Sequence, residues 1–421
     1  MKLLIGGSPC THWSIAQTKN RETEASGIGW ELFLNYRIAR DKYKPDFFLY
    51  ENNKSMSPAI RAQITAELGV EPVLINSALV SAQNRQRLYW AGKRNQDGTY
   101  SQVAVEQPVD RGILLRDILE SGAVTWHEKA YTLRASAATK QGVSNVLRHI
   151  ETNGHFGYMG VAEPVNMTVD GKAQCLRATY YKDGIRNMVG NTIDRKTCVA
   201  EPVRIGTIES KAKNTDFDSQ QYRVYSPDGK SVTLCGQGGG VGAKTGLYAV
   251  PVIPDGKGQF VIKAAGGKEI PVYEVRGGRI TIKGKTYPIK LADGFYIIRK
   301  LTVTECKRLQ TVPDTYAFPV SDTQAYKMLG NGWTVDVIAH IMSHFTGLTE
   351  EAVEVLSMYD GMSCGHIALD KLGVQPWLLR YYATEIDKYA IQTTQHNFPD
   401  TVQLGDAFLV RNDDWRLGDE L

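Results

Sequence analysis

The first 76 residues alternate short apolar runs with helical patterns, and this alternation restricts the fold more than any other feature of the chain. Three of the runs have the length and composition of buried strands: residues 3–5, 46–50 and 73–76. Between them, residues 30–43 have the apolar spacing of a helix, and a second helix is expected from an N-cap at Ser57 to a stop at Gly69. This order predicts a parallel α/β sheet whose strands end at one common edge.

Two reactive side chains follow the first two predicted strands, so the fold should bring them to the same edge. Cys10 follows the first strand, with Pro9 restricting the backbone before it, and Glu51 follows the second strand. The two residues are 51 − 10 = 41 positions apart. Taken alone, Cys10 could also be a small buried core residue.

Two arginines stand close together after the third strand. In an extended chain the i, i+2 spacing of Arg85 and Arg87 directs both side chains to one face, which suits a phosphate or a carbonyl oxygen. Solvent-exposed arginines are the alternative interpretation.

The C-terminal part repeats the strand pattern with acidic residues at the strand ends. Residues 353–359 form an expected strand, followed by the Asp360-Gly361 turn and a helix, an order that seats nucleotide-like cofactors against backbone amides. A strand over 381–384 ends at Glu385, where a carboxylate could accept from ribose hydroxyls. A further short strand ends at Asp406.

The middle of the chain differs from both ends in its residue pattern and in its charge. Residues 101–300 hold 28 Lys and Arg against 19 Asp and Glu, a balance of +9, whereas the remainder holds 21 against 26, a balance of −5. This excess suits contact with a polyanion, although solvated surface is the alternative. Alternating patterns and three weak sequence echoes predict small β units, at residues 131–136, 174–179, 232–236, 259–263 and 269–275. The glycine-rich stretch 236–246 departs from the P-loop pattern and predicts a flexible or DNA-facing loop.

Several classes of protein are disfavoured by composition. The six cysteines form no CxxC pair, so neither a disulfide framework nor a zinc site is expected, and His340 and His344 lack an evident third metal ligand. No apolar run reaches about 18 residues and the start lacks a signal pattern, so we expect a cytoplasmic protein of two or three domains without membrane contact.

A thiol, a carboxylate and arginines beside a cofactor crevice suit nucleophilic catalysis on a flat, electron-poor ring. The thiolate of Cys10 would be the attacking form. Protonation of a ring nitrogen makes the ring a better acceptor, a task for a carboxylic acid placed as Glu51 would be. Cytosine is such a ring.

These motifs together resemble the DNA (cytosine-5-)methyltransferases. The resemblance covers roughly residues 1–95 and 299–410 and rests on eight elements: LIGGSPC with Cys10, Glu51-Asn52-Asn53, Gln83-x-Arg85-x-Arg87, RKLTVTECKRLQTVP at 299–313, Gly330-Asn331, Asp360-Gly361, Glu385 and Gly405-Asp406. The sequence departs from the family pattern at Thr11, Asn53 and Gly332-Trp333.

The resemblance implies a Rossmann-like sheet that binds S-adenosylmethionine, with a β-rich target recognition domain inserted. It implies a catalytic domain in two parts, residues 1–98 and 299–421, with the recognition domain at 99–298. In the family the cofactor elements come first, whereas here the cysteine loop does, which indicates a circular permutation with residues near Leu421 beside Met1. A site completed between two swapped chains is the alternative, but a monomer is expected.

Residue roles follow from the same resemblance. Cys10 would attack C6 of a cytosine flipped out of double-stranded DNA, Glu51 would hold N3 and the amino group, and Arg85, supported by Arg87, would hold O2. The loop at 11–30 would be a lid. The residues expected at the cofactor are Tyr359, Asp360, Gly361, Met362, Ser363, Glu385, Ile386, Asp406, Asn331 and Pro9. Three alternatives stay open: the same chemistry on tRNA, a DNA-binding relative without activity, and an enzyme for free nucleotides.

Overall fold

The computed structural model describes most of both terminal parts of the chain and portions of the middle. The described residues are 1–9, 12–13, 21–120, 202, 204–207, 222–227, 229–234, 247–252, 271–282, 284–299 and 301–417. The chain divides into two compact units: Met1–Glu120, Pro202–Tyr248 and Arg299–Leu421 form the first, and Ser121–Glu201 and Ala249–Ile298 form the second. Residues 99–120 and 202–248, which the sequence assigned to a recognition domain at 99–298, therefore group with the first unit.

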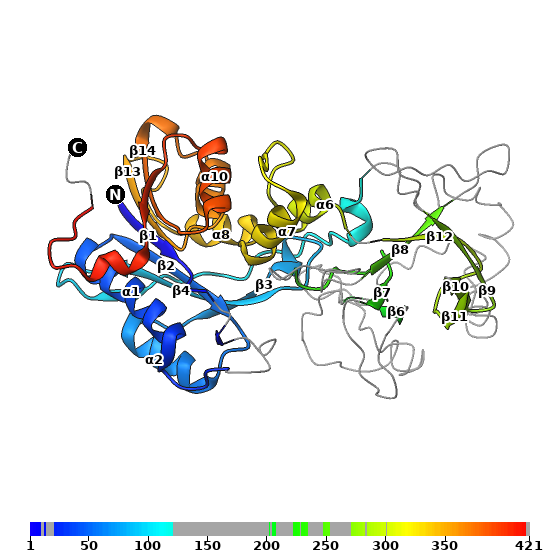
Figure 1. Ribbon diagram of the computed structural model, residues 1–421. Helices are drawn as coiled ribbons and strands as arrows, with labels where there is room; N and C mark the ends of the chain where they lie inside the picture. Colours follow the sequence, from blue (N-terminus) through cyan, green and yellow to red (C-terminus); the bar gives the residue numbers. More distant parts are fainter. Residues whose placement is uncertain are drawn as a thin grey trace, which may run out of the picture. The chain divides into compact units, whose positions relative to one another are not determined.

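The first unit is built on an eight-stranded sheet (Figure 1). Its strands run in the order β15-β14-β13-β1-β2-β4-β3, with β5 paired to β4. Their bounds are β1 Lys2–Gly6, β2 Phe47–Asn53, β3 Val73–Asn76, β4 Gln86–Arg94, β5 Tyr100–Gln102, β13 Val353–Met358, β14 Leu379–Thr384 and β15 Val402–Gly405. The predicted parallel arrangement holds from β15 to β2, but β4 lies antiparallel between β2 and β3.

Helices cover both faces of this sheet, and Figure 1 shows α1 and α2 on one face and α8 and α10 on the other. The helices are α1 Gly27–Tyr43, α2 Pro58–Leu68, α6 Val303–Leu309, α7 Asp322–Asn331, α8 Val335–Met342, α9 Cys364–Lys371 and α10 Lys388–Asn397. Short 3-10 helices are η2 Ser77–Leu79, η3 Leu115–Ile118, η5 Pro376–Leu378 and η6 Ala407–Arg411. An α/β layer arrangement of this kind buries both faces of the sheet.

Local signals explain where these elements begin and end. The Ser57 side chain accepts a hydrogen bond from the backbone N–H of Ile60, and α2 stops at Gly69, whose φ of +75° favours glycine. All seven residues of β2 are buried, so its polar end residues are held inside the protein rather than in solvent. Gly365 of α9 allows close packing on β1, because a Cβ there would lie 2.2 Å from the Ile5 side chain.

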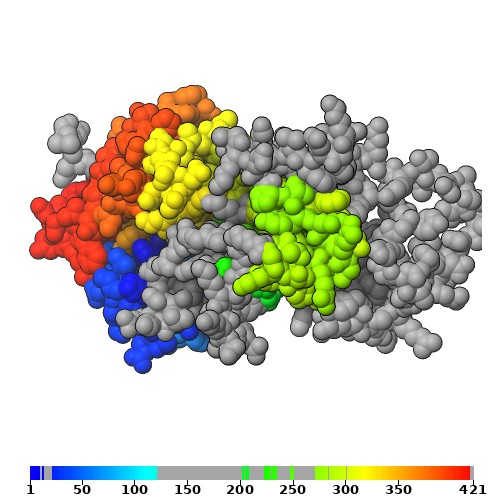
Figure 2. All heavy atoms as spheres, turned by 45° about the vertical axis from the view of Figure 1, so that its right-hand side comes forward, coloured from blue at the N-terminus to red at the C-terminus, as the bar shows by residue number. Residues whose placement is uncertain are grey.

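The two ends of the chain meet in this sheet. β1 pairs with β13, so strands from opposite ends of the sequence are direct neighbours. The C-terminal segment packs on α1, where Arg411 Nε donates to Asn35 Oδ1 at 2.5 Å and Lys42 Nζ donates to the Asn412 carbonyl at 2.6 Å. Figure 2 shows blue and red surface residues of these stretches side by side. Leu421, predicted beside Met1, lies outside the described residues.

The remaining described strands are short. β6 Arg204–Thr207, β7 Arg223–Tyr225 and β8 Leu247–Val252 follow one another in the chain, with β6 antiparallel and β8 parallel to β7. In the second unit, β9 Val272–Arg276, β10 Arg279–Ile282, β11 Lys285–Pro288 and β12 Gly294–Arg299 pair antiparallel. Strand β9 confirms the alternating pattern at 269–275. The unit predicted at 232–236 is wrong in its described part, since residues 232–234 form no strand. The predicted units at 131–136, 174–179 and 259–263 and the loop at 236–246 lie outside the described residues.

Candidate active site

The loop that leads to Cys10 is held at Ser8. The Ser8 hydroxyl and the Tyr50 hydroxyl form a 2.6 Å hydrogen bond, and Asn52 Nδ2 donates to the Ser8 carbonyl oxygen at 3.2 Å. All three residues are buried, whereas Pro9 is exposed. Cys10 itself lies outside the described residues. The last described residues before Cys10 therefore lie at the edge at which β1 and β2 end, and the position predicted for Cys10 stays a prediction.

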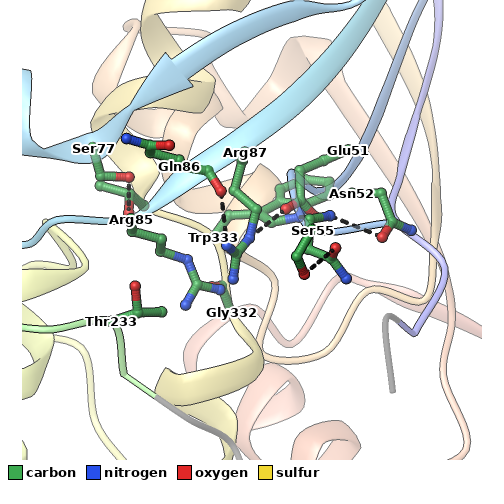
Figure 3. A network of polar contacts seen from close by, with 12 residues as sticks. Glu51, Asn52, Ser55, Ser77, Arg85, Gln86, Arg87, Thr233, Gly332 and Trp333 are labelled. Atoms are coloured by element: carbon green, nitrogen blue, oxygen red, sulfur yellow. Dashed lines mark hydrogen bonds and ion pairs between the residues drawn. The ribbon is translucent and has the colours of Figure 1, made fainter. Parts of the chain in front are cut away.

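Glu51 lies near the carboxyl end of β2 with 8% of its surface exposed. Its Oε1 lies 3.0 Å from Arg87 Nε, and its Oε2 accepts a 2.9 Å hydrogen bond from Trp333 Nε1. Figure 3 shows the three side chains pointing toward one another. A carboxylate offers about four lone-pair positions. Each oxygen is thus held by a donor and keeps a further lone pair for a ligand.

The antiparallel pairing of β2 with β4 explains the position of Arg87. Asn53 lies opposite Arg87 in the register, and Glu51 is two residues before Asn53, so Glu51 and Arg87 are diagonal neighbours on one face. Diagonal pairs of this kind are within reach of long side chains. The sequence treated β4 only as extended chain, so this pairing comes from the tertiary structure.

Arg85 has different partners from Arg87. It is 3% exposed, and its Nη1 donates to the carbonyl oxygens of Leu234 and Gly330, each at 3.2 Å. Its Nη2 donates to the Gly332 carbonyl at 2.9 Å. In Figure 3 the Arg85 side chain runs toward Gly332. The structure therefore directs Arg85 to backbone carbonyls and pairs Arg87 with the carboxylate.

A short segment from the middle of the chain, residues 229–234, packs beside Arg85. The Ser231 N–H donates to the Ala82 carbonyl, and the Thr233 hydroxyl donates to the Asn84 carbonyl at 2.7 Å. Lys230 is 1% exposed, and its ammonium donates to the Ser81 carbonyl at 2.9 Å. No pattern in the sequence indicated that Lys230 is buried, because a lysine in a polar stretch is expected to be exposed to solvent.

The predicted cofactor turn follows β13 and is joined to the end of β14. Tyr359 and Gly361 have φ angles of 60° and 61°, in the left-handed region. The Asp360 N–H donates to the Thr384 carbonyl at 3.1 Å, and the Gly361 N–H donates to Glu385 Oε2 at 2.8 Å. The structure thus brings the glycine turn and the acidic residue after the next strand into direct contact.

Asp360 is the most perturbed carboxyl group of this turn. Withdrawal from water raises its pKa to about 6, although hydrogen bonds from the hydroxyls of Ser357, Ser363 and Tyr381 lower it. The Ser357 and Tyr381 bonds are 2.6 and 2.8 Å long. The nearby Glu385 charge acts in the same direction as burial. The Asp360 carboxyl group therefore stabilises the turn by accepting hydrogen bonds from Ser357, Ser363 and Tyr381.

Of the other residues predicted at the cofactor, some are exposed to solvent and some are buried. Ile386 is 73% exposed, and Asp406, which caps η6 by accepting from the Phe408 N–H at 2.9 Å, is exposed as well. Asn331 is exposed at the end of α7. Met362 and Ser363 are buried. Ile386, Asp406 and Asn331 are thus accessible to a ligand.

Gly332 lies between the cofactor turn and the Glu51 site. A Cβ at Gly332 would lie 3.1 Å from Cys364 Sγ and 3.6 Å from Met362 Sδ, while its carbonyl accepts from Arg85. Burial raises the pKa of the Cys364 thiol to about 12, and the charges of Asp360, Arg85 and Glu51 all act on it. The two halves of the predicted site therefore meet around Cys364.

The two histidines set aside in the sequence have backbone partners. His340 Nε2 hydrogen bonds the Glu106 carbonyl, and His344 Nδ1 hydrogen bonds the His340 carbonyl, each at 2.8 Å. Among the described residues, no three His, Cys, Asp or Glu side chains are grouped so as to hold a metal ion. Within the same part of the chain, no helix combines the length and apolar character needed to cross a membrane.

Comparison with known proteins gives one family. A family model described as C-5 cytosine-specific DNA methylase matches residues 1–346 of the 421. The chain is 24% identical over 378 residues to the orphan methyltransferase M.SPRI of Bacillus phage SPR, covering 80% of this chain and 81% of that protein. It is 25% identical over 338 residues to the orphan methyltransferase M.SPBetaI of Bacillus phage SPbeta, covering 74% and 68%. Against the type II methyltransferase M.HhaI of Haemophilus parahaemolyticus it is 30% identical over 152 residues, covering 35% and 33%.

Two solved structures of methyltransferases are similar to this one. The Entamoeba histolytica methyltransferase EhMeth gives a TM-score of 0.38 at 11% sequence identity, and the match covers 81% of this chain and 76% of that one. The S. pombe Dnmt2 methyltransferase gives a TM-score of 0.35, 13% identity and coverage of 82% and 77%.

Proposed function

Because this chain belongs to the C-5 cytosine-specific DNA methylase family, we propose that it transfers a methyl group from S-adenosylmethionine to carbon 5 of a cytosine in double-stranded DNA. One observation carries the proposal. The Glu51 carboxylate is held between Arg87 and Trp333 at the edge from which the chain enters Cys10. This geometry offers a pyrimidine a carboxylate at its N3 side, and in the proposal the Cys10 thiol acts at C6.

In the proposed reaction the Cys10 thiolate forms a bond to C6, and the electrons of the C5–C6 double bond make C5 nucleophilic. Glu51 stabilises this step by giving a proton to N3 and accepting a hydrogen bond from the exocyclic amino group, and it takes the N3 proton back when the thiolate leaves. Carbon 5 then takes the methyl group. Removal of the C5 proton by a base restores the double bond and releases the Cys10 thiolate, so the enzyme is regenerated.

We propose that the two arginines exchange the roles expected from the sequence. Arg87 lies beside Glu51, which supports its donating to the cytosine O2. Arg85 donates to three carbonyl oxygens of segments that surround the site. We therefore assign O2 recognition to Arg87 and a supporting role to Arg85.

The residues after β13, β14 and β15 fit S-adenosylmethionine, which supplies an electrophilic methyl group when bound. A Cβ at Gly361 or Gly405 would meet nothing within 4 Å, so space is open above both turns. In this proposal Glu385 would accept from ribose hydroxyls, Asp406 would accept from the adenine amino group, and Ile386 would cover the apolar face of the base. Tyr359 and Asp360 shape the turn below.

The order of the strands supports a circular permutation of the family's catalytic domain. The match to the family model ends at residue 346, before β13 begins at Val353. In the sheet, however, β13 is the direct neighbour of β1. A chain that opens with the family's nucleophile strand and closes with its cofactor strands accounts for both observations.

DNA contact is proposed for the middle of the chain. Residues 101–300 carry the +9 charge balance, which suits phosphate contacts, and the second unit would supply base recognition. Because the face of a cytosine ring is inaccessible within a duplex, the base must leave the stack to reach Glu51 and Cys10. The predicted lid at 11–30 lies partly outside the described residues, as does Cys10.

Transfer of tritiated methyl groups to DNA free of 5-methylcytosine tests the proposal, with tRNA as a parallel acceptor. The expected result is label at C5 of cytosine in DNA, and a loss of at least about a thousandfold in Cys10→Ala. Cys306→Ala, which changes a buried cysteine of α6, serves as the matched control and should retain activity. Label in tRNA alone, or unchanged transfer by Cys10→Ala, would contradict the proposal.

A further inference from the structure

Trp333 makes a contact that the family resemblance did not assign to any residue. It lies between α7 and α8, and its indole Nε1 donates to Glu51 Oε2 at 2.9 Å, although the two residues are 282 positions apart. An indole N–H can donate but cannot accept a hydrogen bond. The contact therefore fixes Oε2 as the acceptor and orients the plane of the carboxylate.

The Trp333–Glu51 pair is packed against the loop before Cys10. A Cβ at Gly7 would lie 2.9 Å from Glu51 Oε2 and 3.4 Å from Trp333 Nε1. The backbone of Gly7 thus closes one side of the pair, and a rotation of either side chain toward it would be blocked by van der Waals contact.

The backbone on either side of Trp333 is held by hydrogen bonds. The preceding carbonyl, of Gly332, accepts from Arg85 Nη2 at 2.9 Å and from Gln310 Nε2 at 3.2 Å. The following residue, Thr334, donates through its hydroxyl to Gln310 Oε1 at 2.8 Å and accepts from the Ser77 hydroxyl at 2.8 Å. The backbone N–H of Trp333 itself hydrogen bonds the thiol of Cys364. The backbone of Trp333 is therefore fixed by hydrogen bonds on both sides.

These contacts also explain the arrangement of the carboxylate as a whole. Arg87 Nε lies 3.0 Å from Oε1, and the indole lies on Oε2, so each oxygen has its own donor. Two donors on two oxygens leave little freedom about the last torsion of Glu51. The lone pairs not used by the donors are then held in one orientation.

We propose that Trp333 is a positioning residue for Glu51: together with Arg87, its indole N–H holds the carboxylate in the orientation that meets N3 and the amino group of the target cytosine. This inference rests on the proposed function and adds a residue to it. Trp333 acts through Glu51 and does not itself contact the reacting atoms.

Trp333→Phe keeps an aromatic ring and removes the N–H donor. Because a hydrogen bond to a charged group contributes more than a neutral one, the single-turnover methylation rate should fall about 10- to 100-fold, with KM for S-adenosylmethionine and for DNA unchanged within about twofold. Trp377→Phe is the matched control. Trp377 is 78% exposed and lies just before the start of β14, whereas Glu51 lies near the carboxyl end of β2. This control should change the rate by less than about twofold.

A double-mutant cycle separates positioning from shape. If Trp333 acts through Glu51, Trp333→Phe should have little further effect in a Glu51→Gln background. An equal loss in both backgrounds, or a Trp333→Phe rate equal to that of the wild type, overturns the inference while the proposed function stands. If the wild type transfers no methyl group to C5 of cytosine, the proposed function fails and this inference fails with it.

A second measurement applies if Trp333→Phe does not fold. In wild-type protein labelled with ¹⁵N-tryptophan, Glu51→Gln should move the indole N–H signal of Trp333 and leave that of Trp377 in place. A Trp333 signal that does not move would overturn the inference without any assay of activity.

Discussion

The burial of His366 predicts a measurable pH dependence of stability. This residue of α9 stacks on Phe398 with ring centroids 3.8 Å apart and planes 10° from parallel, and on Tyr381 with centroids 4.7 Å apart. Its side chain is 13% exposed, and Nδ1 has no hydrogen-bond partner in the described part of the chain. Burial lowers its pKa from 6.5 to about 4. The neutral ring is therefore the form that the fold accommodates.

The sign follows from proton binding. Between pH 6.5 and pH 4 the unfolded chain holds a proton on this residue and the folded protein does not, so acid favours unfolding. The stabilisation from the neutral ring is fully present above pH 6.5 and is lost as the pH falls through this window. For these two pKa values, the linkage relation gives a loss of about 1 kcal/mol at pH 5.5 and about 3 kcal/mol at pH 4.5.

His366→Phe removes the titrating group and retains an aromatic ring between Phe398 and Tyr381. Urea unfolding at pH 7.5, 5.5 and 4.5 should show that the variant gains stability relative to the wild type by those amounts as the pH falls. His396→Phe, at an exposed position of α10, controls for replacement of a histidine as such. A difference between wild type and His366→Phe that is the same at all three pH values would refute the reasoning.

Two further predictions concern the buried charges of the site. Arg85→Met should lower the free energy of unfolding by about 3 kcal/mol, because the carbonyls of Leu234, Gly330 and Gly332 lose a buried cationic donor; an unchanged urea midpoint would contradict the supporting role of Arg85. Asp360→Asn should be more stable than the wild type by about 3 kcal/mol at pH 8, since the pKa of Asp360 is raised from 3.8 to about 6 and its ionisation opposes folding as the pH rises between these two values. Thermal melts should show this advantage shrinking toward pH 4, and a constant advantage would exclude the ionisation of Asp360 as its cause.

Local patterns in the sequence were sufficient for the elements that carry the site. Strands β1, β2 and β3 and helices α1 and α2 lie where apolar spacing and end signals predicted them. The Asp360-Gly361 turn and Glu385 follow neighbouring parallel strands, as the strand pattern indicates, although their contact is seen only in the structure. These features depend on residues close together in the chain, or on the rule that parallel strands end at one edge, so one sequence is enough to find them.

Tertiary packing decided which side chains face one another. The spacing of Arg85 and Arg87 directs both to one face, but only the antiparallel β2–β4 pair shows that Arg87 reaches Glu51. Likewise, Trp333 lies 282 residues from Glu51, and its partner depends on where the chain places the end of α7 relative to β2. A hydrogen bond of this kind cannot be predicted from sequence periodicity. It forms only when the tertiary fold brings two segments together, and the local sequence of neither segment specifies the other as its partner.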